Sequence, residues 1–245
     1  MLHRLTIATL VLLSPPVVGA DTDRQTRTFP LPPGRVISLD ITIGQVRIEG
    51  SAGDEAVIDI VRHAPTGEGL ARIPVIIEED EAQLRVRGLQ ADGATDPALR
   101  TDVTIRVPHE AVVRSVQIAE GRLTLANLQG AITATLKRGS IDATGLQGVV
   151  RLETVIGDIV ADRTRLSADG LLRLRAFNGN VRLSLVALPP DARIMALALN
   201  GTISSEIPLR MKDTWGPRWG EATLGKGDPV ISIDVITGKI DIKVE

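Results

Sequence analysis

One short pattern decides the fold, and its four clearest copies are Gly121-Arg-Leu-Thr-Leu125, Gly139-Ser-Ile-Asp-Ala143, Gly157-Asp-Ile-Val-Ala161 and Gly179-Asn-Val-Arg-Leu183. An aliphatic residue stands two positions after each glycine, and an aliphatic or small residue stands four positions after it. The positions three, five and seven before each glycine are apolar too, and only Arg114 and Thr154 break that set. A period of two predicts a strand with one face buried and the other in water. The sequence therefore predicts an all-β protein.

Each copy of the pattern is interpreted as strand, glycine corner, strand. Glycine suits the corner because it tolerates positive φ and has no side chain to clash there. The corner glycines are predicted to be structural, and they are Gly44, Gly121, Gly139, Gly157, Gly179, Gly201 and Gly238.

Five successive corner glycines, from Gly121 to Gly201, follow one another at intervals of 18 or 22 residues. Two similar links, Asn127-Leu-Gln-Gly130 and Gly145-Leu-Gln-Gly148, recur between units. A near-constant period of about 20 residues favours a right-handed β-solenoid of about seven units. An antiparallel β-meander or roll would explain the alternation as well, and it stays open as the alternative.

The chain of 245 residues is predicted to form one domain after an export signal. Residues 1–20 contain a basic start, a short apolar run and the small residues Val18-Gly19-Ala20, which is typical of a cleaved signal peptide. A less regular β part is expected over 21–107. Regular repeats follow over 108–245, with a tryptophan-containing insertion at 206–229.

Composition excludes several classes of protein. The chain has no Cys, so disulfides, thiolate metal sites and cysteine nucleophiles are excluded. A net charge of −2 and an aromatic content of 2% argue against nucleic acid as a partner. No later segment is apolar for long enough to span a bilayer, so we expect no integral membrane span in the mature chain.

The repeats resemble the putative adhesin family of bacterial envelope proteins. The resemblance rests on the four glycine segments quoted above, on Thr104-Ile-Arg-Val-Pro108 before them and on the closing segment from Ile231 to Ile242. It covers most of 35–245. It implies a β-solenoid fold and an envelope location, and it supplies no catalytic residue and no ligand.

Enzymatic chemistry has little support in the sequence. A polysaccharide-active β-helix enzyme would need carboxylates clustered on one outer face. The outward positions after the corner glycines carry a mixture of charged and polar residues instead, no two carboxylates stand in the same row on adjacent units, and Asp142 and Asp158 are diagonal neighbours at best. His63 and His109 lack metal-ligand spacing, and the acidic run 78–81 is interpreted as a charged turn. We expect no catalytic residues, no metal and no cofactor.

The insertion at 206–229 carries the best candidate contact residues. Tryptophan and arginine are the usual anchors of binding surfaces. The predicted partner contacts are therefore Trp215, Trp219, Arg210 and Arg218. The alternative is that the two tryptophans only cover the open end of the repeats.

The sequence predicts a non-enzymatic protein that is adhesin-like or binds a macromolecule of the envelope or of a surface. It would be exported to the bacterial periplasm, the cell surface or the medium. The two alternatives are a polysaccharide-active β-helix enzyme and an envelope accessory factor that binds lipid or an outer-membrane partner.

Overall fold

The structure is a computed structural model that describes residues 21–93, 95–212 and 216–245. Within these residues the chain is almost entirely β. The strands are β1 Asp21–Pro30, β2 Val36–Ser51, β3 Glu55–Ala64, β4 Val75–Glu79, β5 Gln83–Gly88, β6 Arg100–Pro108, β7 Val112–Ala126, β8 Ile132–Thr144, β9 Val149–Ile156, β10 Ile159–Thr164, β11 Leu171–Asn178, β12 Val181–Leu185, β13 Ala192–Ser205, β14 Arg210–Met211, β15 Arg218–Leu224 and β16 Val230–Val244. A short helix α1 (Gly67–Ala71) and one 3₁₀ turn (Ala91–Gly93) are the helical elements described, and the sequence had predicted neither.

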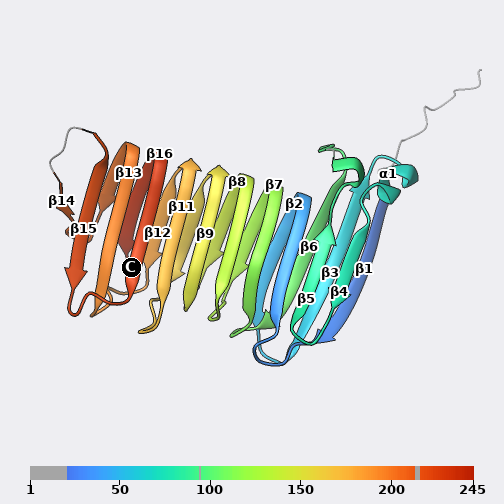
Figure 1. Cartoon of the computed structure of the whole chain (residues 1–245), viewed down its shortest axis with the longest axis horizontal. Helices are drawn as coiled ribbons and strands as arrows, with labels where there is room; N and C mark the ends of the chain where they lie inside the picture. The colour runs from blue at the N-terminus through green and yellow to red at the C-terminus, as the bar shows by residue number, and fades with distance from the viewer. Residues whose placement is uncertain (1–20, 94, 213–215) are drawn as a thin grey trace, which may run out of the picture.

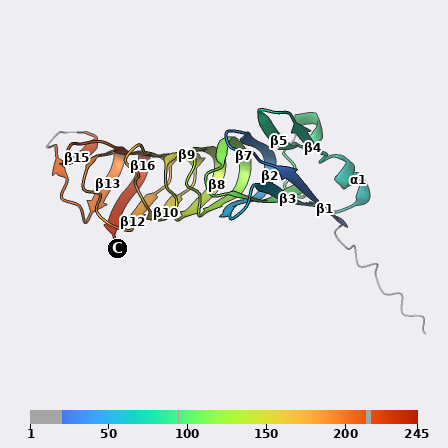
Figure 2. The ribbon, with the colours of Figure 1, turned by 90° about the horizontal axis from the view of Figure 1, so that it is seen from below.

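The strands form two walls that run along the long axis of the molecule (Figures 1 and 2). Wall A is the sheet made by the chain before the glycine corners, and its strand order is β4-β5-β2-β7-β8-β9-β11-β16-β13-β15-β14. Wall B is the sheet made after the corners, and its order is β1-β3-β6-β2-β7-β8-β10-β12-β16-β13. The long strands β2, β7, β8, β13 and β16 pass through a corner and belong to both walls.

The corner glycines stack directly on one another. A Cβ atom added to any of the seven would lie only 1.6–2.0 Å from a backbone carbonyl oxygen of the neighbouring strand. At Gly157 that oxygen belongs to Gly139, and the φ of +138° is also one that other residues rarely adopt. Glycine is therefore required here both by the backbone conformation and by the close approach of the next strand.

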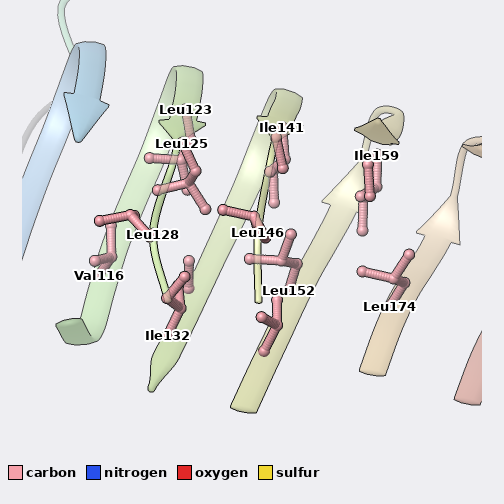
Figure 3. Packing of buried hydrophobic residues seen from close by; sticks show 14 of the residues in the cluster. Val116, Leu123, Leu125, Leu128, Ile132, Ile141, Leu146, Leu152, Ile159 and Leu174 are labelled. Carbon is pink, nitrogen blue, oxygen red and sulfur yellow. The ribbon is translucent and has the colours of Figure 1, made fainter. Parts of the chain in front are cut away.

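Aliphatic side chains fill the space between the walls. Leu123, Ile141 and Ile159 lie in register on adjacent strands of wall B and are fully buried. Figure 3 shows how these residues pack with side chains from wall A and from the links between the walls, including Leu128 and Leu146. Each such side chain contributes about 1.5–3 kcal/mol by leaving water, and the predicted inward face of the repeats is confirmed by this burial.

The predicted right-handed β-solenoid is wrong. The hydrogen-bonded ladders close on themselves in the order β8, β9, β11, β16, β12, β10 and back to β8. The result is a closed barrel of six parallel strands with further strands added at both ends. It closes because β8 and β16 bend at Gly139 and Gly238, so that each strand pairs in wall A with one half and in wall B with the other.

The strands also depart from chain order, and the alternative prediction of an antiparallel meander or roll is wrong as well. β16 lies between β11 and β12 on one side and β13 on the other, so Gly238 stacks between Gly179 and Gly201. All ladders of the ring are parallel. In the described chain, antiparallel pairs join β1 to β3, β3 to β6, β4 to β5, β13 to β15 and β14 to β15.

The part of the chain expected to be less regular, 21–107, contains β1 to β5 and nearly all of β6, and β2 connects it to the repeats by pairing with both β6 and β7. The acidic run 78–81 ends β4 and forms the turn into β5, as predicted. The stretch 206–229 contains β14 and β15, which extend the far end of wall A.

We predict that Ile159→Asp unfolds the protein at a much lower temperature than the wild type. Ile159 is fully buried between Ile141 and Val181, so the new carboxylate would be unpaired in an apolar interior and cost about 4 kcal/mol or more. Thermal denaturation followed by circular dichroism measures the change. Val160→Asp is the matched control, because Val160 is partly exposed on the other side of the same strand. Equal melting temperatures for the two variants would contradict the inward assignment.

We predict that Gly157→Ala costs more than about 4 kcal/mol, because the new methyl group meets the Gly139 carbonyl. Gly53→Ala separates that clash from backbone strain. Gly53 has a similarly positive φ of +123° but no atom within 4 Å of the added Cβ, so its change should cost about 1–2 kcal/mol. Denaturant unfolding gives both values, and a Gly157→Ala cost no larger than that of Gly53→Ala would refute the steric argument.

Candidate contact surface

The outer faces of the two walls differ in chemistry. In wall A, the position two residues before each corner glycine points outward, and in four adjacent strands it carries a large apolar side chain. We call this set the apolar row, and it consists of Val155, Phe177, Ile236 and Leu199.

The pairing register brings the apolar row together. Residues 176 and 178 of β11 pair with residues 154 and 156 of β9 and with residues 235 and 237 of β16, so Phe177 lies between Val155 and Ile236. The pairs Ala198↔Val235 and Asn200↔Thr237 place Leu199 beside Ile236 in the same way. Val155 is 38% exposed and Leu199 is 40% exposed, so the row faces water.

Cationic side chains lie next to the apolar row. The guanidinium of Arg175 lies over the ring of Phe177, 4.6 Å from its centroid. Arg175 Nη1 is 4.0 Å from a carboxylate oxygen of Glu153, and Arg173 Nη2 is 3.8 Å from one of Asp234. These ion pairs are exposed and worth little to stability. The outer face of wall A is therefore flat, and rows of charged side chains lie beside the apolar row.

Trp219 extends this surface toward the end of wall A. It pairs with Leu197 across the antiparallel β13–β15 ladder, and directly opposed residues place their side chains on the same face. Leu197 points outward, as does Leu199 two residues later. The Lys212 ammonium lies 3.8 Å from the centroid of the Trp219 ring. Trp219 is partly buried, so part of its side chain remains in contact with water.

The structure separates the residues that the sequence had grouped as partner contacts. Arg210 pairs with Glu221, which lies two residues from Trp219 on the same face, so Arg210 and Trp219 share the outer face of wall A. Arg218 pairs with the inward-facing Ala198 and belongs to the opposite side of the strand. Trp215 lies outside the described residues. Sequence analysis missed the apolar row, although its signal was present as apolar residues at a predicted outward position.

Wall B has a polar outer face. A hollow of about 570 Å³ there contains Asp158, Arg182 and Asp241. Asp158 directly precedes β10 and Asp241 lies on β16, with β12 between these two strands. Asp158 Oδ1 accepts hydrogen bonds from the backbone and side-chain amides of Asn180, at 2.7 and 3.1 Å, and a carboxylate oxygen of Asp241 is 3.7 Å from Nε of Arg182. Both carboxylates are therefore held by donors and are not paired for proton sharing.

The described residues include no group of three or more His, Asp or Glu side chains that could hold a metal ion. His63 Nε2 is 3.2 Å from Asp102, and His109 Nδ1 contacts the Asn127 carbonyl oxygen at 2.8 Å, so the two histidines have different partners.

Two carboxyl groups with shifted pKa values lie away from the contact surface. Backbone amides of Gln83 and Ala82 donate to Asp80 Oδ1 at 2.7 and 2.8 Å and lower the pKa of Asp80. A side-chain hydrogen bond from Arg24 lowers the pKa of Asp59. A lowered folded-state pKa contributes stability at neutral pH that is lost as the pH falls through it, so acidification removes the stability that both groups contribute.

In the described part of the chain, every helix is too short to cross a membrane. No protein-family model matches the chain, and no curated protein matches it in sequence.

Several solved structures are similar to it. A putative cell adhesion protein from Clostridium sporogenes is 12% identical over 92% of this chain and 100% of that chain, with a TM-score of 0.49. A putative adhesin from Bacteroides fragilis is 11% identical over 91% and 97%, with a TM-score of 0.41. A putative lipid binding protein from Parabacteroides distasonis is 8% identical over 91% and 97%, with a TM-score of 0.22. The first is named for cell adhesion and the second as an adhesin, in line with the resemblance seen in the sequence, and similarity this low transfers no function.

We predict that Trp219→Ala lowers the free energy of unfolding by about 1–3 kcal/mol, because the ring is partly buried against β13 and stacks with Lys212. Arg218→Ala is the control, since its side chain is exposed on the other side of β15, and it should change stability by no more than about 0.5 kcal/mol. Urea unfolding measures both. If Trp219→Ala cost no more than Arg218→Ala, Trp219 would not stabilise the end of the wall.

Proposed function

We propose that this protein is a non-enzymatic, adhesin-like binding protein of the bacterial envelope, and that the outer face of wall A contacts a macromolecule of the envelope or of a neighbouring surface. The observation that carries the proposal is the apolar row. Its four large apolar side chains occupy the same outward position on four adjacent strands. They do not contribute to the interior, which is filled by the inward-facing rows. Contiguous exposed apolar surface of this kind marks interaction sites.

The composition of the surface supports binding of a large partner. Phe177 and Trp219 supply aromatic area, Arg175 and Lys212 lie over their rings, and charged pairs surround them. Aromatic residues and arginine are enriched at the centres of protein interfaces, and a polar rim surrounds them. A flat sheet face offers a broad contact area and no enclosed cavity, which suits a macromolecule better than a small molecule.

The proposed location rests on residues 1–20, which lie outside the described residues. Their basic start, short apolar run and small residues at the end are those of a signal peptide. Cleavage would leave a chain that begins near Asp21 in the periplasm, on the cell surface or in the medium. Mass spectrometry of the protein secreted by a bacterial host would give the new N-terminus, and an intact Met1 would refute export by this route.

The second candidate function is that of an envelope accessory factor that binds lipid or an outer-membrane partner. It is favoured by the same apolar row, because side chains such as Phe177 and Leu199 can enter a lipid surface while Arg175 remains with the head groups. The two candidates share one surface and differ in the partner.

We predict that the double change Phe177→Ser and Leu199→Ser weakens binding to isolated bacterial envelopes by about tenfold or more, because it removes the centre of the apolar row. Cosedimentation of the purified mature protein with envelopes measures binding. A parallel flotation assay uses vesicles of phosphatidylethanolamine and phosphatidylglycerol. Thermal denaturation checks that the double variant remains folded.

Val160→Ser is the matched control, since Val160 is a partly exposed apolar residue on wall B. It should bind envelopes like the wild type. If the wild type binds envelopes more tightly than the double variant and does not bind vesicles, the partner is a macromolecule. If the wild type binds the vesicles and the double variant binds them more weakly, the lipid candidate is supported. Undiminished binding of the double variant to both would overturn the proposed surface.

A further inference from the structure

A second hollow lies on the outer face of wall A, away from the apolar row. It has a volume of about 560 Å³ and is bounded by the first half of β2, by β5 and by the start of β7. The strands that carry the apolar row and Trp219 are β9, β11, β16, β13 and β15, whereas β5, β2 and β7 lie where the N-terminal strands join the repeats (Figure 1). It is therefore a separate site with its own chemistry.

A β-bulge in β7 shapes one side of the hollow. Ile37 pairs with Val113 and Leu39 pairs with Val116, so Ser38 of β2 faces both Arg114 and Ser115. Ser115 has a φ of +55°, which is uncommon for a residue other than glycine. The extra residue turns both Arg114 and Ser115 outward, and both are exposed. Bulges commonly redirect side chains beside functional sites.

Two buried polar atoms beside the hollow lack partners. Ser38 is only 8% exposed and points outward from β2, and its Oγ forms no hydrogen bond within the described structure. Nε of Arg87, on the adjacent strand β5, is also buried without a partner. Leaving such groups unsatisfied costs stability. Both can donate a hydrogen bond, so the group that would satisfy them is an acceptor.

The charges of the hollow favour an anion. Arg85, Arg87 and Arg114 line it, and Asp40 is the one carboxylate among the lining side chains. Glu78 binds Arg87 at 2.5 Å and lies 3.8 Å from Arg85. Arg114 forms no ion pair with any described residue, so its charge is uncompensated. Guanidinium groups bind carboxylates and phosphates through paired hydrogen bonds.

We propose that this hollow binds a hydroxylated small molecule through its carboxylate or phosphate group. The anionic group lies between Arg114 and Arg87 and accepts hydrogen bonds from Arg87 Nε and Ser38 Oγ. The exposed, unpaired guanidinium of Arg114 reorients to admit the anion and then contacts it from the β7 side. The carboxylate of Asp40 and the amide of Gln117 face the hollow from β2 and β7 and bind the hydroxyl groups.

Isothermal titration calorimetry with three related sugars tests this site. Glucuronate carries a carboxylate, glucose 6-phosphate carries a phosphate, and glucose carries neither. We expect at least one anionic sugar to bind at about 10 mM or below and glucose not to bind. The anion that binds more tightly identifies which group the site prefers. Absence of binding by both anions, or equal binding by glucose, overturns the proposal.

Two variants locate the binding site. Arg114→Gln should weaken anion binding by about tenfold, because it removes the uncompensated charge. Ser38→Ala should weaken it by about fivefold while leaving the melting temperature unchanged or raised, because it also removes an unsatisfied buried hydroxyl. Arg151→Gln is the control, since Arg151 is an exposed arginine of β9 outside the hollow, and it should bind like the wild type. Anion binding that survives Arg114→Gln and Ser38→Ala would place the anion elsewhere and overturn the assignment.

Discussion

The whole structure depends on the close contact between backbones at the glycine corners. Each corner carbonyl occupies the space that a Cβ atom would need on the next strand, so only glycine permits the strands to stack at this spacing. Once the corners are in contact, the register of both walls is fixed, because residues at equal distances from each glycine must lie side by side. The buried aliphatic rows and the exposed apolar row follow from the same alignment.

Much of the fold could be predicted because period-two alternation determines which side chains face inward. Even one exception has a structural reason: Arg114 stood at an expected inward position, and the bulge at Ser115 places Val113 there instead. Thr154, the other exception, is buried with its hydroxyl unpaired. The solenoid prediction failed because the repeat period carries no information on whether ladders close into a ring. The period also does not predict which strands β16 pairs with, because the segment around Gly238 has the same repeat pattern as the other units.

The candidate sites were harder to predict than the fold. Trp219 and Arg218 were predicted together as partner contacts, but they lie on opposite sides of β15, because adjacent residues of a strand point in opposite directions. The apolar row was visible in the sequence only after its four strands were known to be neighbours, and that needed the position of β16. The hollow at Ser38 and Arg114 required knowledge of the bulge and of the parallel pairing between β2 and β5, which are far apart in sequence.

The position of β16 has a consequence for how the chain acquires its structure during synthesis. β13 is attached to the rest of the molecule only through β16, among the described strands, and β15 and β14 are attached only through β13. The strands β13, β14 and β15 therefore have no completed sheet to join until residues 230–244 have left the ribosome. The segment from β13 to β16 therefore docks on the earlier strands only after the last strand has been made, so the end of the molecule that carries β13, β14 and β15 is completed in one late step of folding.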